Sequence, residues 1–110
     1  MYTYNAKVIR VIDGDTVELD IDLGFTIHWK SSCRLYGINT PELNSKDKDE
    51  KLKALEAKNF LIQELVLGSY VVINSRKLDK YGRPLVEIIN NNININQELL
   101  VLGLAKEYII

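Results

Sequence analysis

The sequence of 110 residues has one cysteine, Cys33, and one histidine, His28. A lone cysteine cannot form an intramolecular disulfide, and it argues against a zinc site made of thiolates. His28 has no second histidine and no cysteine cluster near it in the sequence. We therefore do not expect His28 to act as a general base or as a metal ligand.

Long apolar runs are also missing. No stretch approaches the roughly 20 apolar residues that a membrane-spanning helix needs, although apolar residues make up 46% of the chain. The first five residues lack the basic and then apolar pattern of a signal peptide. We expect a cytoplasmic protein with no membrane partner, and a secreted location stays open if a leader has been removed.

Charge of one sign is not in excess, because 14 Lys and Arg residues stand against 15 Asp and Glu residues. A protein that holds nucleic acid mainly through a basic surface usually carries a strong positive excess. Any role with nucleic acid must therefore depend on a local site. The length predicts one domain, residues 1–110, with a modest hydrophobic core.

Apolar periodicity predicts five strands and two helices. After an Asp-Gly turn, four apolar residues from Val17 to Leu23 alternate with acidic ones, which is typical of a half-buried antiparallel strand. The second helix begins at an Asn94 cap with Gln97 three residues later, and Gly103 ends it. The expected strands are 7–12, 16–23, 27–38, 70–74 and 85–89; the first helix is 49–67, ended by Gly68; and 77–82 is a charged loop.

Three strands, a helix, two strands and a helix in this order indicate an α+β fold. Antiparallel strands with inserted helices fit a small, five-stranded closed barrel of the OB type. In the third strand, Cys33 and Leu35 share one face, so that Arg34 points out of the core if this pair packs inward.

The stretch 34–42 (RLYGINTPE) combines groups that bind metal and phosphate. Pro41 fixes its own φ and favours extended geometry at Thr40, which leaves the Thr40 carbonyl exposed in a fixed direction. Hard cations bind carboxylate, amide and carbonyl oxygens, often in one site. In this stretch Glu42 can polarise a water molecule, and Arg34 can pair with a phosphate.

Two further segments carry similar groups. Asp13 and Asp15 place two carboxylates on a tight turn that lacks the spacing of an EF-hand loop. Arg83 lies where a turn leads into a strand, and the next residue, a proline, favours extended geometry there. Each pattern alone is more typical of an ordinary turn or a solvated arginine. Together with 34–42 they indicate a phosphodiester site, in which a divalent cation and two arginines stabilise charge on phosphorus.

Four motifs resemble those of the thermonucleases, the staphylococcal nuclease-like family, in their order and approximate spacing. The likeness runs from about residue 7 to residue 108. The motifs are 11–17 (VIDGDTV), 34–42 (RLYGINTPE), 79–83 (DKYGR) and 103–106 (GLAK).

The resemblance implies an OB barrel with helices and a nuclease that depends on Ca²⁺, with other divalent metals left open. It implies DNA and RNA as substrates, with single strands preferred and 3′-phosphate products. Glu42 matches the family's proposed general base, and the arginines match its phosphate clamps. By motif position, the catalytic residues are Arg34, Glu42 and Arg83; the calcium ligands are Asp15, Asn39 and the Thr40 carbonyl; and the nucleotide-binding residues are Lys80 and Tyr81. Tyr108, outside the four motifs, is assigned to nucleotide binding because it lies near the place of the family's base-stacking tyrosines.

Two departures from the family bear on these expectations. The best-known members carry an aspartate where this chain has Asn39, and an uncharged amide predicts weaker metal affinity. They also continue into a third helix with tyrosines that stack on the base, whereas only Tyr108 remains near that place here. We expect the third helix to be absent or vestigial and base stacking to be thinner or supplied by a partner chain. Apolar surface left by that helix favours a homo-oligomer.

Three functions are compatible with the sequence. The first is a metal-dependent, sugar-non-specific endonuclease. The second is an OB-fold module that binds nucleic acid or protein with weak or no catalysis, and the third is a purely structural interaction domain. Retention of Glu42, Arg34 and Arg83 together favours the enzyme, because degenerate domains tend to lose these residues.

Overall fold

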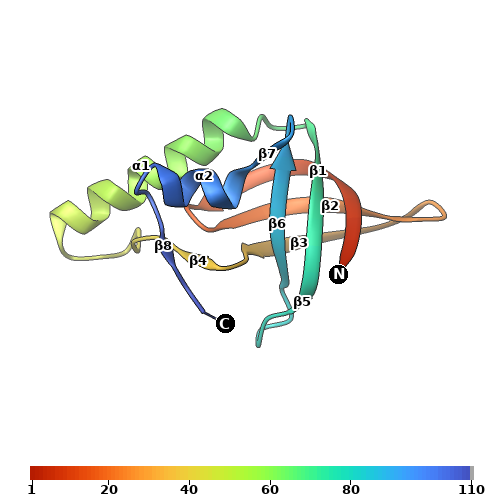
Figure 1. Cartoon of the computed structure of the whole chain (residues 1–110), viewed down its shortest axis with the longest axis horizontal. Coiled ribbons are helices and arrows are strands. Elements are labelled where there is room, and N and C mark those ends of the chain that lie inside the picture. Colours follow the sequence, from red (N-terminus) through yellow and green to blue (C-terminus); the bar gives the residue numbers. More distant parts are fainter. Residues whose placement is uncertain (110) are drawn as a thin grey trace.

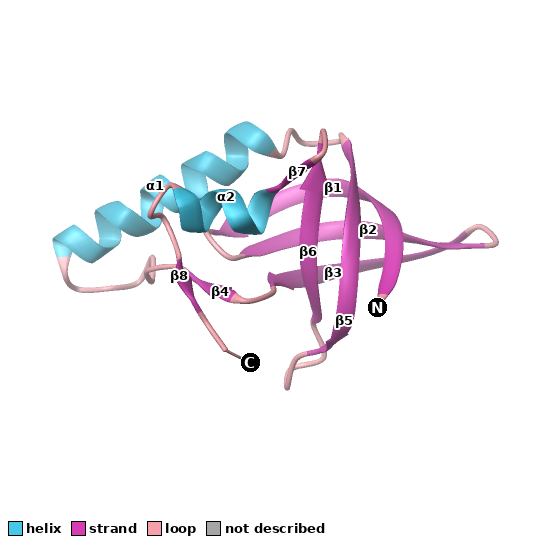
Figure 2. Cartoon of the chain, in the orientation of Figure 1, coloured by secondary structure: helices cyan, strands magenta, loops and turns pink. Residues whose placement is uncertain are grey.

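The structure is a computed structural model that describes residues 1–109. Five long strands close into a barrel, and two helices lie beside it (Figure 1, Figure 2). In chain order the elements are β1 (Tyr2–Asp13), β2 (Thr16–Gly24), β3 (Ile27–Leu35), β4 (Ile38–Asn39), α1 (Lys48–Glu64), β5 (Tyr70–Leu78), β6 (Pro84–Asn90), β7 (Ile93–Asn94), α2 (Ile95–Val101) and β8 (Lys106–Glu107).

The barrel closes through a parallel pair of strands. Neighbours in the order β3-β2-β1-β5-β6-β7 are antiparallel, and β3 also pairs with β6. This closing pair is parallel and aligns Arg34 with Leu85 and Leu35 with Val86. The sequence indicated antiparallel strands and a closed barrel but not which strands close it, because no local pattern indicates a pairing between segments so far apart. The predicted fold, α+β with a five-stranded OB-type barrel and two helices, is confirmed.

The alternation of β2 places its apolar residues inside the barrel, as predicted. Val17, Leu19 and Ile21 are buried in the core. Leu23 continues the same face but is 38% exposed. The reason is that the β2–β3 hairpin projects beyond the barrel, where no layer covers it (Figure 1).

Helix α1 packs against the barrel beside β1 and buries the apolar stripe that the sequence predicts. The Asp47 side chain caps its first turn by accepting a hydrogen bond from Asp49 N. The buried residues of the stripe are Ala54, Ala57, Leu61 and Leu65.

Helix α1 ends at Glu64, three residues before the predicted end. A tertiary contact explains the difference, because Asn90 Nδ2 donates a 2.7 Å hydrogen bond to the Glu64 carbonyl and satisfies a group left open at the helix end. Leu65 then leaves helical geometry with φ −110° and ψ 80°. Gly68, the predicted stop, lies in the following turn instead, where its N–H donates to Val8 O at 2.8 Å.

The predicted strand 27–38 is interrupted, and the interruption shapes the candidate site. Gly37 has a left-handed φ of 79°, which turns the chain between β3 and β4. β4 then pairs with β8, aligning Ile38 with Glu107 and Asn39 with Lys106. The C-terminal tail is therefore held beside the residues that follow β3.

β5 is longer than predicted, because Lys77 and Leu78 pair with β6 although we placed them in the loop 77–82. β1 is longer too. It begins at Tyr2 rather than at residue 7, because its first residues pair with β5 over the span from Tyr70 to Ser75.

Helix α2 begins as predicted, with the Asn94 side chain accepting a 3.2 Å hydrogen bond from Gln97 N. No third helix follows α2 in the part of the chain that ends at residue 109. Within that same part, neither helix is long and apolar enough to cross a membrane.

Candidate active site

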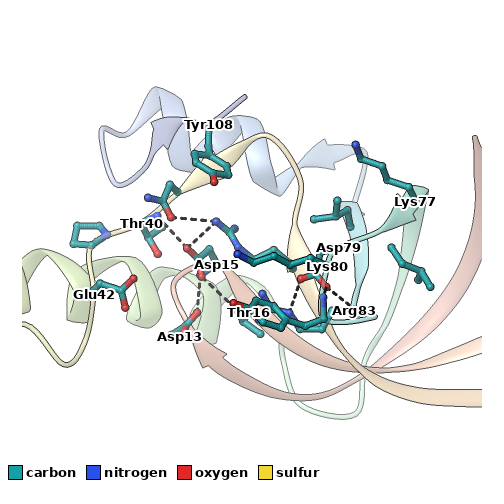
Figure 3. Close-up of a pocket in the computed structure, with 16 residues that line it drawn as sticks. Asp13, Asp15, Thr16, Thr40, Glu42, Lys77, Asp79, Lys80, Arg83 and Tyr108 are labelled. Atoms are coloured by element: carbon teal, nitrogen blue, oxygen red, sulfur yellow. Dashed lines mark hydrogen bonds and ion pairs between the residues drawn. The ribbon is translucent and has the colours of Figure 1, made fainter. Parts of the chain in front are cut away.

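A cavity of about 640 Å³ lies between the β1–β2 turn, the segment that joins β4 to α1, and the β5–β6 loop (Figure 3). Segments far apart in the sequence thus contribute to one site. Its lining includes every residue that we assigned from the sequence to catalysis, metal binding or nucleotide binding. These residues are Asp15, Arg34, Asn39, Thr40, Glu42, Lys80, Tyr81, Arg83 and Tyr108.

The acidic turn between β1 and β2 is held against Thr40 and α1. Asp13 Oδ1 accepts a 3.1 Å hydrogen bond from Asp15 N, a local bond that aspartates commonly make in turns. Gly14 permits a close approach, since a Cβ there would lie 2.8 Å from both Ala57 Cβ and Thr40 Oγ1. Thr40 N in turn donates to Asp15 Oδ2 at 3.1 Å. The Asp15 carboxylate and Thr40 are therefore fixed relative to each other.

Arg34 lies between the side-chain oxygens of Asp15 and Asn39. Its neighbours Cys33 and Leu35 are fully buried, as predicted, and the alternation turns Arg34 into the cavity. Arg34 Nη2 lies 3.4 Å from Asp15 Oδ2 and donates to Asn39 Oδ1 at 3.1 Å, while Nη1 donates to Leu35 O at 3.0 Å. The Arg34 side chain is only 12% exposed, so these charged contacts are largely shielded from water.

The segment after β4 presents Glu42 to the cavity. Thr40 is buried, and Pro41 follows it directly and restricts its backbone to extended geometry. Glu42 is exposed, and its carboxylate is directed toward the acidic turn (Figure 3). The start of α1 holds the segment, because Glu50 accepts hydrogen bonds from Glu42 N at 3.5 Å and from Ser45 Oγ at 2.9 Å.

Asp79 organises the β5–β6 loop and positions Arg83. Asp79 Oδ1 accepts hydrogen bonds from Tyr81 N and Arg83 N, both at 2.9 Å, and Oδ2 accepts one from Arg83 Nε at 2.7 Å. Burial raises the pKa of the Asp79 carboxyl, but these hydrogen bonds and the Arg83 charge outweigh it, and the pKa lies below its ordinary value. The Arg83 side chain remains 33% exposed and lines the cavity.

The three predicted nucleotide-binding residues lie at the rim of the cavity. Tyr81 is 72% exposed, and its ring lies 5.2 Å from Lys80 Nζ and 5.6 Å from Arg83 Cζ, within the range of cation–π contacts. Tyr108 is 50% exposed and is fixed by its N–H, which donates to Gly37 O at 2.9 Å. The geometry gathers these residues, while their roles in binding stay predictions.

The chain is also similar to proteins of a known family. The model of the family described as staphylococcal nuclease homologue matches residues 32–110. The chain belongs to this family.

Three relatives of this staphylococcal nuclease homologue show how far the likeness extends. An uncharacterised protein of Methanocaldococcus jannaschii is 33% identical over 96% of the chain and 60% of its own length. The protein named thermonuclease from Staphylococcus hyicus is 31% identical over 91% of the chain and 57% of its own length. Endonuclease YhcR of Bacillus subtilis is 31% identical over 97% of the chain and 9% of its own length. The chain thus spans less than two thirds of each of these relatives.

The staphylococcal nuclease family is expected to use a divalent cation, and the oxygens of the cavity fit one. Asp15, Asn39 and Thr40 line the cavity together, and the Asp15 carboxylate, the Asn39 amide and the Thr40 carbonyl would supply oxygen atoms only, the ligands that Ca²⁺ and Mg²⁺ take. Asp15 and Asn39 already direct oxygens at one cation, the Arg34 guanidinium. No group of three or more His, Cys, Asp or Glu side chains in residues 1–109 is arranged to hold a metal. A bound cation would therefore depend on amide, carbonyl and water oxygens as well.

Two acidic residues of the cavity received no role of their own from the sequence, although Asp13 was part of the acidic turn and Asp79 part of the motif 79–83. Asp13 lines the cavity beside Asp15. Burial raises the pKa of the Asp13 carboxyl most, and the neighbouring Asp15 carboxylate raises it further, whereas the hydrogen bond from Asp15 N lowers it only in part. The Asp-Gly-Asp sequence was a usable signal for Asp13. Asp79 was recognisable only as an aspartate at a turn, four residues before Arg83.

Proposed function

We propose that this chain is a nuclease that hydrolyses phosphodiester bonds in DNA and RNA with the help of a divalent cation. The observation that carries the proposal is the meeting of oxygen ligands, two arginines and Glu42 at one cavity. Membership of the staphylococcal nuclease family supports the same activity, as do relatives named thermonuclease and endonuclease. The proposal extends to Ca²⁺ as the metal, to single strands as the preferred substrate and to 3′-phosphate products.

The metal ligands in this proposal are Asp15, Asn39 and the Thr40 carbonyl. A bound divalent cation supplies positive charge for the phosphate oxygens. The protein contributes rigidity, because Thr40 N already holds Asp15 Oδ2 in place. The neighbouring Asp13 carboxylate adds negative charge to the same turn, which favours a cation there.

Glu42 is the proposed general base. It is exposed and directed toward the acidic turn, so water can reach it there (Figure 3). Glu42 accepts a proton from the attacking water as the oxygen of that water bonds to phosphorus, and the departing sugar oxygen takes up a proton. General bases of this kind contribute about 10²–10⁴-fold to a rate.

Arg34 and Arg83 are the proposed phosphate clamps, and different partners position them. Arg34 is largely buried against Asp15 and Asn39, whereas Arg83 is partly exposed and paired with Asp79. Their guanidinium groups donate to the phosphate oxygens on which charge develops. A lysine at either position keeps the charge but loses the two-pronged geometry. We therefore expect Arg83→Lys to lower the cleavage rate by about 10²-fold.

The test is digestion of single-stranded DNA and of RNA in calcium, in magnesium and in chelator. Asp15→Asn protein, purified in parallel, controls for contaminating nucleases, and circular dichroism shows whether both proteins are folded. We expect cleavage by the wild type in calcium, none in chelator, and a large loss in Asp15→Asn. Folded wild-type protein that leaves both substrates intact with every metal would reject the nuclease proposal and favour an OB-fold binding module.

A separate measurement tests Asn39 as a ligand. Asn39→Asp adds a negative charge to the oxygen set, and the calcium concentration for half-maximal activity should fall by on the order of tenfold, since ligand charge sets affinity in such sites. The assay is a calcium titration of cleavage with both proteins. An unchanged calcium requirement would count against direct ligation by Asn39.

A further inference from the structure

A second cavity, of about 210 Å³, opens beside the start of β1, the β2–β3 hairpin and the end of β5. Three aromatic residues line it, Tyr2, Tyr4 and Trp29, and we refer to it as the aromatic groove. The rings of Tyr2 and Tyr4 stack with centroids 6.5 Å apart and an interplanar angle of 23°. Tyr2 is 67% and Trp29 38% exposed, so aromatic surface is open to a planar ligand.

The charge of the aromatic groove has one sign. Arg76 and Lys77 are the charged residues among those that line it, and no carboxylate is among them. Arg76 pairs with Glu87 at 3.4 Å, whereas no ion pair involves Lys77 in residues 1–109. Aromatic faces next to cations are the combination that proteins use to bind single-stranded nucleic acid, by stacking bases and contacting phosphates.

The aromatic groove adjoins the candidate active site. Lys77 and Leu78 line both cavities, so a single stretch of β5 separates them. A nucleic-acid strand with one phosphate between Arg34 and Arg83 can therefore continue across Lys77 into the groove. At about 210 Å³ the groove is smaller than the 300–1,000 Å³ typical of pockets for drug-sized ligands, which suits one planar base better than a larger compound.

We propose that the aromatic groove is a base-binding subsite for single-stranded nucleic acid. Tyr2 and Trp29 stack on a base of the substrate strand beyond the phosphate that is cut, and Lys77 contacts a phosphate between the two cavities. This inference rests on the proposed nuclease function and adds to it a site that selects for longer and unpaired strands. A base in a duplex is already stacked and paired, so it cannot enter the groove.

Trp29 makes the groove directly observable, because it is the chain's only tryptophan. The probes are a dinucleotide of thymidine and a single-stranded dT oligomer of about 8 nucleotides, within the range that one OB fold covers. Glu42→Gln protein is used in calcium, because its cleavage should be about 10²–10⁴-fold slower than that of the wild type during the titration. We expect the oligomer to quench Trp29 emission and the dinucleotide to leave it unchanged. Anisotropy of a fluorescein-labelled oligomer, measured separately, reports binding at any site.

Two variants and a matched control locate the effect. Tyr2→Ala should weaken oligomer binding roughly tenfold, the weight of one stacked base, and leave dinucleotide cleavage unchanged. Lys77→Ala should lower the slope of log affinity against log salt by about 0.7, the value for one phosphate of a single strand. The control is Tyr70→Ala, which removes an equally exposed tyrosine at the opposite end of the β1–β5 pairing, where Tyr70 aligns with Lys7. Tyr70→Ala should change neither the affinity for the oligomer nor the dependence of that affinity on salt.

Each outcome decides the proposal. Oligomer binding by anisotropy without any change in Trp29 emission would overturn the subsite and leave the nuclease proposal standing. Oligomer binding weakened equally by Tyr2→Ala and Tyr70→Ala would overturn the subsite too. Trp29 emission that depends on protein concentration alone would also overturn it, because it would show a second copy of the chain in the aromatic groove. An oligomer that does not bind at all would overturn the subsite, and cleavage of single-stranded DNA by the wild type would then decide the nuclease proposal separately.

Discussion

Replacing Gly14 with alanine tests how the acidic turn is fixed in the site. An added Cβ would lie 2.8 Å from Ala57 Cβ, 2.8 Å from Thr40 Oγ1 and 3.1 Å from Thr40 Cβ. Carbon atoms prefer separations of about 3.5–4.0 Å, so the carbon contacts are short by roughly half an ångström or more. These atoms lie next to the backbone, and they can withdraw only if α1 or the β4–α1 segment shifts.

The expected loss of stability is moderate. Overpacking a tightly packed site costs about 1–3 kcal/mol. Alanine also lowers the conformational entropy of the unfolded chain relative to glycine, which offsets about 0.4–1 kcal/mol of that cost. The net change in the free energy of unfolding is therefore a loss of about 1–2 kcal/mol. Activity should fall as well, because the same shift moves Thr40 away from Asp15 Oδ2, to which its N–H donates at 3.1 Å.

The assay is urea unfolding followed by Trp29 fluorescence, with a double mutant as the decisive comparison. Ala57→Gly removes the Cβ that the new methyl group meets, so Gly14→Ala should cost less in that background, by about 0.5 kcal/mol or more. Gly24→Ala is the control, because Gly24 has a φ of 83° but nothing within 4 Å of an added Cβ. Its cost is conformational and should not depend on Ala57. Gly14→Ala protein as stable as the wild type, or strict additivity with Ala57→Gly, would refute the reasoning.

Three further predictions concern stability and reactivity. Asn96 is 2% exposed, donates to the carbonyls of Tyr36 and Val86 and accepts from Ile88 N, so Asn96→Ala should lower the free energy of unfolding by about 3 kcal/mol; a loss below about 1 kcal/mol in urea unfolding would contradict this. Burial raises the pKa of Cys33 to about 12, so the folded protein should resist a disulfide reagent at mildly alkaline pH, and fast labelling without denaturant would show the thiol to be accessible. Because hydrogen bonds and Arg83 hold the pKa of Asp79 below its ordinary 3.8, this carboxylate stabilises the fold above that pH, and the stabilisation is lost as the pH falls through the folded-state value. Asp79→Asn should therefore have a lower Tm than the wild type at neutral pH, and this difference in Tm should shrink at acidic pH. A difference in Tm that grows on acidification would contradict the prediction.

Local patterns in the sequence predicted the elements that depend on neighbours along the chain. The alternation of β2 and the apolar stripe of α1 indicate that one face of each element is buried, and Asn94 at the start of α2 indicates a local capping hydrogen bond. Three of the motifs also contain eight of the nine assigned residues, and all nine line one cavity. Periodicity and turn chemistry depend on residues close together in the chain, so these features can be predicted from the sequence.

Pairings between distant segments were not predictable in this way. The extra length of β1 depends on β5, the early end of α1 depends on Asn90, and closure of the barrel depends on a parallel pair between β3 and β6. The two hydrogen bonds that Arg83 donates to the Asp79 carboxylate have a local origin, but an aspartate in a turn does not show which side chain it will bind. The aromatic groove likewise joins Tyr2 and Trp29, which no shared motif connects.

The most direct test of the central claim is cleavage of single-stranded DNA at saturating calcium by wild type and by Glu42→Gln, with DNA affinity measured for both proteins. If Glu42 activates water at a metal and phosphate site, the substitution should slow cleavage by about 10²–10⁴-fold and leave affinity nearly unchanged. Cleavage by Glu42→Gln at the wild-type rate would contradict the account. Wild-type protein that binds the DNA in calcium and never cuts it would contradict it as well.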